Sequence, residues 1–265
     1  MRKLTYLATL MLAGTLTVSA ADVAITVGGG TGTESDPYII SSPAHLLELA
    51  EACNTKGTTA AANSHFTGKF FKMTADIDMD TVTTFIGIGT AAYGKSSNQS
   101  AYYFDATFDG AGHTIRNMRI SAIAYNESGD TKTIVTQTGT GNPASRSSVG
   151  LFGNLWYNAV VKNVNLDASC SVSGYQYVGS IAGYLKADGT AAKPGHGSQV
   201  INCTSAATVT GAGSNVGGIA GYGSRTTANG MILIDGCAFT GKVTGDQGTV
   251  GGILGYGSRV MVTNS

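Results

Sequence analysis

Three aspartates at alternating positions, Asp76, Asp78 and Asp80, form the densest acidic group in the chain. In a β-strand, alternate side chains lie on one face, so these carboxylates could bind calcium or act as an acid cluster. The calcium loop of an EF-hand would need glycine directly after the third acid and glutamate at its twelfth position, where Thr81 and Gly87 stand. We therefore expect a solvated strand face or turn caps, with calcium binding as the open alternative.

A second group, Asp105, Asp109 and His113, could supply an acid and a base for glycan cleavage. Hydrolysis needs two carboxylates that flank one bond, and elimination needs a basic residue or a metal to stabilise the intermediate. Asp109-Gly110 and Gly112-His113 instead have the composition of a turn between strands. We expect a structural role for this group, and we expect no catalytic residue, no cofactor and no metal in the chain.

The four cysteines are Cys53, Cys170, Cys203 and Cys237, and none forms a Cys-x-x-Cys pair. A redox motif or a structural zinc site is therefore not indicated. Cys203 and Cys237 occupy the same position in successive copies of a sequence repeat. They should stack about 4.8 Å apart, which is within disulfide range. A disulfide and a pair of buried thiols both fit this arrangement, and we expect the buried thiols.

Three tyrosines, Tyr184, Tyr222 and Tyr256, also hold equivalent positions of the repeat. Two of them continue as Tyr-Gly-Ser-Arg, which adds Arg225 and Arg259. Stacked tyrosines beside an arginine pair could form a strip that binds sugar rings or a partner protein. The alternative is an aromatic ladder that only covers a corner of the fold. These five residues are the candidate ligand-binding set.

The elements that would position these residues can be inferred from a short glycine-containing sequence motif, called the phrase below, that occurs four times. Its closing glycines recur at intervals of roughly 30 to 38 residues, which is typical of a solenoid. Three short strands and three turns per repeat describe one coil of a parallel β-helix. We expect the glycines to supply turn conformations closed to other residues. The copies are Val149–Gly153, Val178–Gly183, Val216–Gly221 and Val250–Gly255.

The predicted fold is all-β, a right-handed parallel β-helix with a short N-terminal capping helix. The helix is expected over Ser42–Cys53, with Ser42 as N-cap and Pro43 at the first helical position. Asn163, Asn202 and Asn264 are expected to align as a side-chain ladder.

The chain is expected to divide into four segments. These are a signal peptide at 1–20, a flexible lead-in at 21–37, the cap and first coils at 38–148 with a polar loop from 125, and repeat coils at 149–265 that end in mid-coil.

The composition suits a strand-rich fold, and the N-terminal sequence predicts that the chain is exported. Of 265 residues, 38 are glycine and 12% are charged, which suits short strands and tight turns. Arg2 and Lys3, an apolar run and Val18-Ser19-Ala20 have the pattern of a signal peptide. Its removal leaves 16 − 2 = 14 basic against 16 acidic residues, a net charge of −2 that does not indicate nucleic acid or an anionic membrane as partner.

The repeated phrase, with a following strand such as Val200–Cys203, resembles the GLUG repeat of bacterial exported proteins. The stretches Gly32–Ile40, Thr74–Met79 and Phe108–Ile115 resemble the lead-in of such proteins, so the resemblance covers nearly the whole mature chain. It implies a secreted or surface-displayed β-helix, often adhesin-like, and sometimes joined to an immunoglobulin-cleaving metallopeptidase. The chain departs from that last case because it has no His-Glu-x-x-His and its four histidines are scattered.

We therefore predict a non-catalytic, adhesin-like binding module, secreted or on the outer cell surface. Its expected partner is an extracellular glycan or a host or bacterial surface protein, with no membrane insertion after signal cleavage and with further coils or domains beyond Ser265. Two other classes stay open. A polysaccharide lyase or hydrolase is disfavoured, since no carboxylate or basic cluster recurs at a common position, and a structural stalk is favoured by the abrupt end of the last coil.

Overall fold

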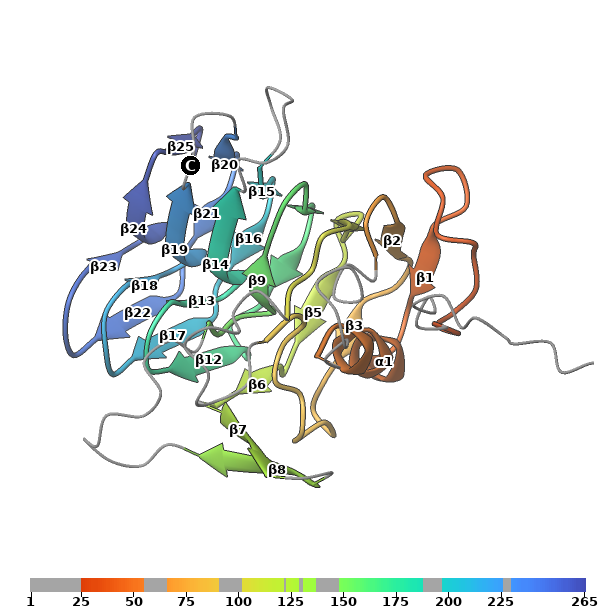
Figure 1. The fold of residues 1–265 in the computed structure, drawn as a ribbon, viewed down its shortest axis with the longest axis horizontal. Helices are drawn as coiled ribbons and strands as arrows, with labels where there is room; N and C mark the ends of the chain where they lie inside the picture. Colours follow the sequence, from red (N-terminus) through yellow and green to blue (C-terminus); the bar gives the residue numbers. More distant parts are fainter. Residues whose placement is uncertain are drawn as a thin grey trace, which may run out of the picture.

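The chain folds as a β-solenoid with one short helix among its described residues (Figure 1). The residues described by the computed structural model are 25–54, 66–90, 102–121, 123–128, 131–136, 148–187, 197–225 and 230–265. The predicted signal peptide at 1–20 lies outside them, as do His65 and His196. Within the described part, no helix is long and apolar enough to span a membrane.

Parallel strands stack into five sheets that run along the solenoid. The largest sheet contains, in spatial order, β1 (Tyr38–Ile40), β2 (Phe70–Met73), β4 (Thr107–Asp109), β10 (Val160–Lys162), β15 (Gln199–Ile201), β20 (Ile232–Asp235) and β25 (Val260–Thr263). The second contains β3 (Ile77–Asp78), β5 (Thr114–Arg116), β11 (Asn165–Leu166), β16 (Thr204–Ser205) and β21 (Ala238–Phe239). The third contains β6 (Arg119–Ile120), β12 (Ser171–Gly174), β17 (Thr208–Gly211) and β22 (Lys242–Gly245).

The other two sheets contain the repeated glycine phrase. One contains β13 (Val178–Gly179), β18 (Val216–Gly217) and β23 (Val250–Gly251). The other contains β9 (Phe152–Leu155), β14 (Ala182–Ala187), β19 (Ala220–Arg225) and β24 (Leu254–Ser258). The predicted repeat register is confirmed, because Ala182 pairs with Phe152 and Ala220 pairs with both Ala182 and Leu254. The prediction of three strands per coil is wrong: β10 to β14 make one coil, because corners divide the chain into strands of two to six residues.

Close approach of backbone atoms, within a coil and between coils, and not a positive φ, explains the glycines of the phrase. Glycines with positive φ occur elsewhere in the described chain, and none belongs to the four copies of the phrase. At Gly217, a Cβ atom would lie 1.9 Å from the Ala220 carbonyl oxygen and 2.6 Å from the Gly255 nitrogen. Both neighbours are backbone atoms, so only a residue without Cβ lets the chain pass between them.

The aligned asparagines hold a corner in the left-handed backbone region, where asparagine is favoured over other non-glycine residues. The predicted ladder between asparagines is wrong in its partners. Asn163 Nδ2 donates to Asp109 at 2.9 Å, and Asn264 Nδ2 donates to Asp235 at 2.8 Å, so each of these asparagines contacts an aspartate of the preceding coil. The corner position is held by Asn163, Asn202, Gly236 and Asn264, with φ of 56°, 51°, 61° and 51°.

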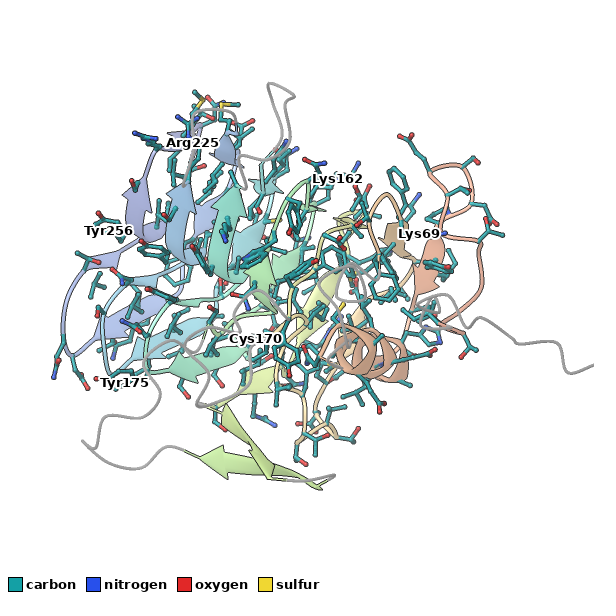
Figure 2. All side chains as sticks on the ribbon, viewed as in Figure 1. Lys69, Lys162, Cys170, Tyr175, Arg225 and Tyr256 are labelled. Atoms are coloured by element: carbon teal, nitrogen blue, oxygen red, sulfur yellow. The ribbon has the colours of Figure 1, made fainter. Side chains whose placement is uncertain are left out.

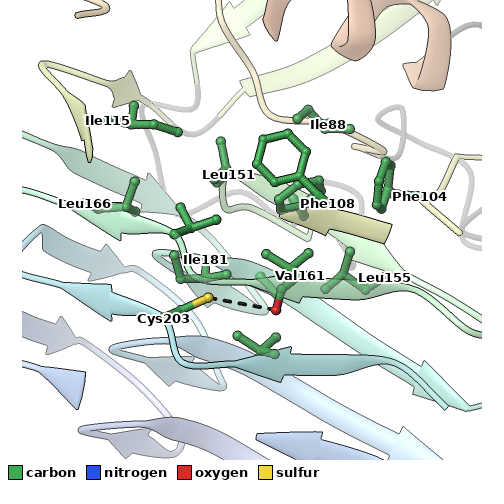
Figure 3. Packing of buried hydrophobic residues seen from close by; sticks show 14 of the residues in the cluster. Ile88, Phe104, Phe108, Ile115, Leu151, Leu155, Val161, Leu166, Ile181 and Cys203 are labelled. Carbon is green, nitrogen blue, oxygen red and sulfur yellow. Dashed lines mark hydrogen bonds between the residues drawn. The ribbon is translucent and has the colours of Figure 1, made fainter. Parts of the chain in front are cut away.

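Inward side chains of all five sheets form one hydrophobic core (Figure 3). In the largest sheet, Phe71, Phe108 and Val161 occupy the same register and are at most 1% exposed. Cys203 belongs to this core, and its thiol points to the Val161 carbonyl at 3.8 Å. Burial of such a row stabilises the solenoid by roughly 1.5–3 kcal/mol per large apolar side chain.

The predicted capping helix is confirmed as α1 (Pro43–Asn54), which lies beside β1 at one end of the solenoid (Figure 1). The backbone N–H of His45 donates to the Ser42 hydroxyl at 3.4 Å, as expected of an N-cap. Leu46, Leu49 and Cys53 belong to its apolar stripe and are buried. The long loop predicted from residue 125 is partly wrong, because β7 (Ile123–Ser128) and β8 (Thr131–Thr136) pair as an antiparallel hairpin.

Candidate functional site

The three predicted tyrosines contact one another in sequence along the sheet that contains β14, β19 and β24. Tyr184 and Tyr222 are register partners with ring centroids 5.1 Å apart, and Tyr222 and Tyr256 follow at 5.3 Å with an interplanar angle of 8°. Tyr177, which the sequence comparison did not single out, stacks on Tyr222 at 4.5 Å. We call these four residues the tyrosine row.

Exposure rises along the tyrosine row toward β24. Tyr184 is 9% exposed, Tyr222 is half-buried and Tyr256 is 43% exposed. Because the two faces of the Tyr222 ring are covered by Tyr177 and Tyr256, this ring cannot stack on a sugar. It can offer only its edge and its hydroxyl group. The accessible chemistry of the row is therefore hydrogen bonding and edge contact by Tyr222 and Tyr256.

The arginine pair does not continue the tyrosine row. Arg225 is three residues beyond Tyr222 in β19, so its side chain starts on the opposite face of the strand. Its Nη1 donates to the Gly230 carbonyl. Arg259 follows β24 with φ of 59° and is exposed. Figure 2 places Arg225 and Tyr256 on separate parts of the molecule, and a role of either arginine in binding stays a prediction.

The aspartates at the second sheet already bind neighbouring residues of the protein. Asp76 accepts hydrogen bonds from the Thr114 backbone at 3.0 Å and from Arg116 at 2.7 Å, and His113 Nδ1 lies 3.3 Å away. The Thr114 N–H bond holds the pKa of Asp76 below its ordinary value, with further lowering by His113 and Arg116. This carboxylate is thus bound to the next coil and not directed at a ligand.

Asp78 and Asp80 have the same arrangement. Asn117 Nδ2 donates to Asp78 at 2.8 Å, and Arg119 lies 3.4 Å from Asp80. The Asn117 bond lowers the pKa of Asp78. Among the described residues, no group of three or more histidine, cysteine or acidic side chains could hold a metal ion. The expected solvated strand face therefore describes these aspartates better than a calcium site does.

The second candidate group is not assembled as a catalytic set. His113 contacts Asp76 and belongs to another sheet. Asp105 lies before β4 and is separated from it by a bend at Ala106, whereas Asp109 is the last residue of β4. Asp109 accepts hydrogen bonds from Asn163 and from the Ala111 N–H, so the two carboxylates have different partners. Asp105 is 3% exposed and accepts a hydrogen bond from the Thr67 hydroxyl, which agrees with the expected structural role.

Two hollows, which the sequence did not indicate, open on either side of Thr107 on the outer face of the largest sheet. The first, of 310 Å³, is lined by Glu34, Ser35, Pro37, Phe70, Phe71, Lys72, Thr107, Asp109 and Lys162. The second, of 220 Å³, is lined by Thr67, Gly68, Lys69, Asp105, Ala106, Thr107, Tyr157 and Asn158. Figure 2 shows Lys69 and Lys162 on this side of the molecule. A third hollow, of 340 Å³, lies beside α1 and includes Leu47 and Phe85.

The stacked cysteines are buried thiols. Cys203 and Cys237 are free and at most 2% exposed. The pKa of Cys203 is raised by its hydrogen bond with Cys237 and by burial, whereas the same bond lowers the pKa of Cys237. Burial raises the pKa of Cys170 to about 11. The expectation of small apolar residues in the core agrees with this arrangement.

Comparison with known proteins supports the architecture. No family model matches the chain, so the resemblance to GLUG-repeat proteins stays a prediction. Halomucin from Haloquadratum walsbyi is 30% identical over 195 residues, and the match covers 72% of this chain and 2% of Halomucin. A crystal structure from Bacteroides ovatus, of a protein provisionally named an immunoglobulin A1 protease, superimposes with a TM-score of 0.53. It is 24% identical, and the match covers 89% of this chain and 67% of that one.

These findings change one prediction. The prediction that the chain is not an enzyme is contradicted, because a protein with the same fold is provisionally named a protease. At 24% identity the likeness establishes the shared fold. The parallel β-helix itself is confirmed by this likeness and by the strand register.

Proposed function

We propose that this chain is a glycan-binding module of an extracellular protein, and that the tyrosine row is its contact surface. Sugar hydroxyl groups both donate and accept hydrogen bonds, as a tyrosine hydroxyl does. Tyrosines held by their neighbours lose little conformational freedom when a ligand binds, which favours affinity. Binding of this kind is compatible with a catalytic centre elsewhere in the same protein.

The observation that carries this proposal is the outward stacking of Tyr222 and Tyr256. The two rings are nearly parallel at 5.3 Å, and Tyr222 remains partly open to solvent although it packs against Tyr177 and Tyr256. An aromatic side chain that is both fixed in orientation and open to solvent is typical of binding surfaces. Because the row follows the solenoid, an elongated ligand could contact successive coils, and each contact would make the next one intramolecular.

The experiment is a glycan array read with four forms of the protein. The wild type is compared with Tyr222→Phe/Tyr256→Phe, which keeps the stacked rings and removes both hydroxyl groups, and with Tyr222→Ala/Tyr256→Ala. Tyr175→Ala is the matched control, because Tyr175 is a half-buried tyrosine that is not one of the four contacting rings and lies away from Tyr256 (Figure 2).

We expect binding by the wild type and the control, weaker binding by the phenylalanine variant, and no binding by the alanine variant. Each lost hydroxyl should weaken affinity by roughly fivefold, since a net hydrogen bond contributes about 1 kcal/mol. An array on which the wild type binds no glycan would contradict the proposal. Equal binding by the alanine variant and the control would show that the glycan contacts another surface.

A further inference from the structure

The 310 Å³ hollow on the largest sheet is a formed depression with an ordered rim. Residues 33–36 make a tight turn above the sheet, closed by a hydrogen bond of 3.2 Å from the Asp36 N–H to the Thr33 carbonyl. The turn is attached to β2 because the Phe70 N–H donates to the Gly32 carbonyl at 3.0 Å. The volume of the hollow is at the lower end of that of small-ligand sites, which run from roughly 300 Å³ upward.

Strand register aligns the polar groups at the base of the hollow. Lys72 of β2 pairs with Asp109 of β4, and Asp109 pairs with Lys162 of β10, so three charged side chains form one row across adjacent strands. The neighbouring outward row contains Phe70 and Thr107. Members of a row on adjacent strands are about 4.8 Å apart, and the two rows are two residues, or about 7 Å, apart along the strands, so Phe70 and Lys72 can contact the same ligand.

The charged side chains of the hollow differ in how many partners they have within the protein. Asp109 accepts hydrogen bonds from Asn163 at 2.9 Å and from the Ala111 N–H at 2.8 Å, and Lys162 Nζ lies 3.4 Å from it. Lys162 is thus directed at Asp109. Lys72 is exposed and makes no ion pair with any carboxylate of the described chain. The ammonium group of Lys72 is therefore the cation available to a ligand.

The other lining groups define the remaining chemistry. Phe70 is half-buried, so part of its ring is open to the apolar face of a ligand. Ser35 and Thr107 carry hydroxyl groups that donate and accept. Glu34 also lines the hollow, where its carboxylate can accept hydrogen bonds from ligand hydroxyls and repels a ligand carboxylate.

We propose that this hollow binds an acidic sugar residue, a hexuronate of an extracellular polysaccharide, with its carboxylate at Lys72 and its ring against Phe70. This inference rests on the proposed glycan binding for its ligand class and adds a site that is separate from the tyrosine row. Hydroxyl groups of the sugar donate to Glu34 and accept from Thr107. A carboxylate paired with an ammonium group gives a strong, charge-assisted hydrogen bond.

The test is calorimetric titration with trigalacturonate and with its methyl ester, which keeps the rings and removes the negative charges. Wild type is compared with Lys72→Met, which keeps the length of the side chain, with Phe70→Ala, and with the control Lys242→Met. Lys242 is exposed on β22, in another sheet. Circular dichroism shows whether each variant is folded.

We expect wild type and Lys242→Met to bind trigalacturonate equally, and Lys72→Met to bind it at least about tenfold more weakly, as for loss of a hydrogen bond to a charged group. Wild type should bind the methyl ester about tenfold more weakly than the acid. Wild type and Lys72→Met should bind the methyl ester with equal affinity. Phe70→Ala should weaken both ligands, and Glu34→Gln should bind the acid at least as tightly as wild type.

Equal affinity for acid and ester, or an unchanged affinity of Lys72→Met for the acid, would overturn the inference, as would no binding of trigalacturonate at all. The tyrosine variants separate this failure from failure of the proposed function. Glycan binding that is lost in Tyr222→Ala/Tyr256→Ala and unchanged in Lys72→Met would leave the tyrosine row in place and refute the hollow alone. Trigalacturonate binding that survives in the tyrosine variant would support the hollow by itself.

Discussion

Substitution of Gly217 by alanine should strongly destabilise the solenoid. The new Cβ would lie 1.9 Å from the Ala220 carbonyl oxygen and 2.6 Å from the Gly255 nitrogen, where contacts below 3.0 Å force a shift. Ala220 belongs to the same coil as Gly217 and Gly255 to the next, and Gly217 is paired with Gly179 and Gly251, so relief requires the backbone of its own coil and of the neighbouring coil to shift. Such overpacking costs about 3 kcal/mol, at the upper end of its usual range.

Gly252 is the matched control, because it belongs to the same repeated phrase but has open space, with no heavy atom within 4 Å, where a Cβ would be added, and no positive φ. Gly252→Ala should be neutral or should stabilise by roughly 0.4–1 kcal/mol, since alanine restricts the unfolded chain. The assay is thermal unfolding followed by circular dichroism. For a chain of this size, about 3 kcal/mol corresponds to a Tm decrease of about 6–12 °C for Gly217→Ala. Equal Tm values for the two variants would refute the argument that coil contact selects this glycine.

Two further predictions concern titratable groups. Because hydrogen bonds to Thr114 and neighbouring groups lower the pKa of Asp76, its contribution to stability is present above its ordinary pKa and is lost as the pH falls through the lowered one. The Tm of Asp76→Asn should therefore fall less than that of wild type when the pH is lowered from about 5 to about 2. An equal decrease in Tm would contradict this. All four thiols are buried and free, so they should react with a thiol reagent at pH 8 only after unfolding. A count of two thiols in the unfolded protein would reveal a disulfide.

The positions that repeat were predictable because each coil copies the preceding one. Val178, Val216 and Val250 are register partners, and so are Tyr184, Tyr222 and Tyr256, as the spacing indicated. The helix was predictable for a local reason, since Ser42 and Pro43 are signals that act within one turn. The prediction of three strands per coil was wrong because strands of two residues, such as β11 and β13, are too short to show alternation.

The chemistry of the repeated residues was less predictable. Arg225 is close in sequence to Tyr222 but donates to the Gly230 carbonyl, since an odd spacing along a strand directs the two side chains to opposite faces. The glycines of the phrase were expected to supply special turn conformations, yet they are needed where backbone atoms come close, within a coil and between coils. Such distances depend on the folded backbone and on the neighbouring coil, which the residue types of the phrase do not specify.

By itself, the sequence determined the winding of this protein: a repeat of solenoid length, a helical cap and an apolar interior. Only the tertiary structure decided which polar side chains meet on the surface. Lys72, Asp109 and Lys162 form one row although unequal lengths of chain separate them, because insertions at the corners leave the strand register intact. The unequal spacing conceals such a row from any periodic comparison, whereas backbone hydrogen bonds between coils place its members side by side.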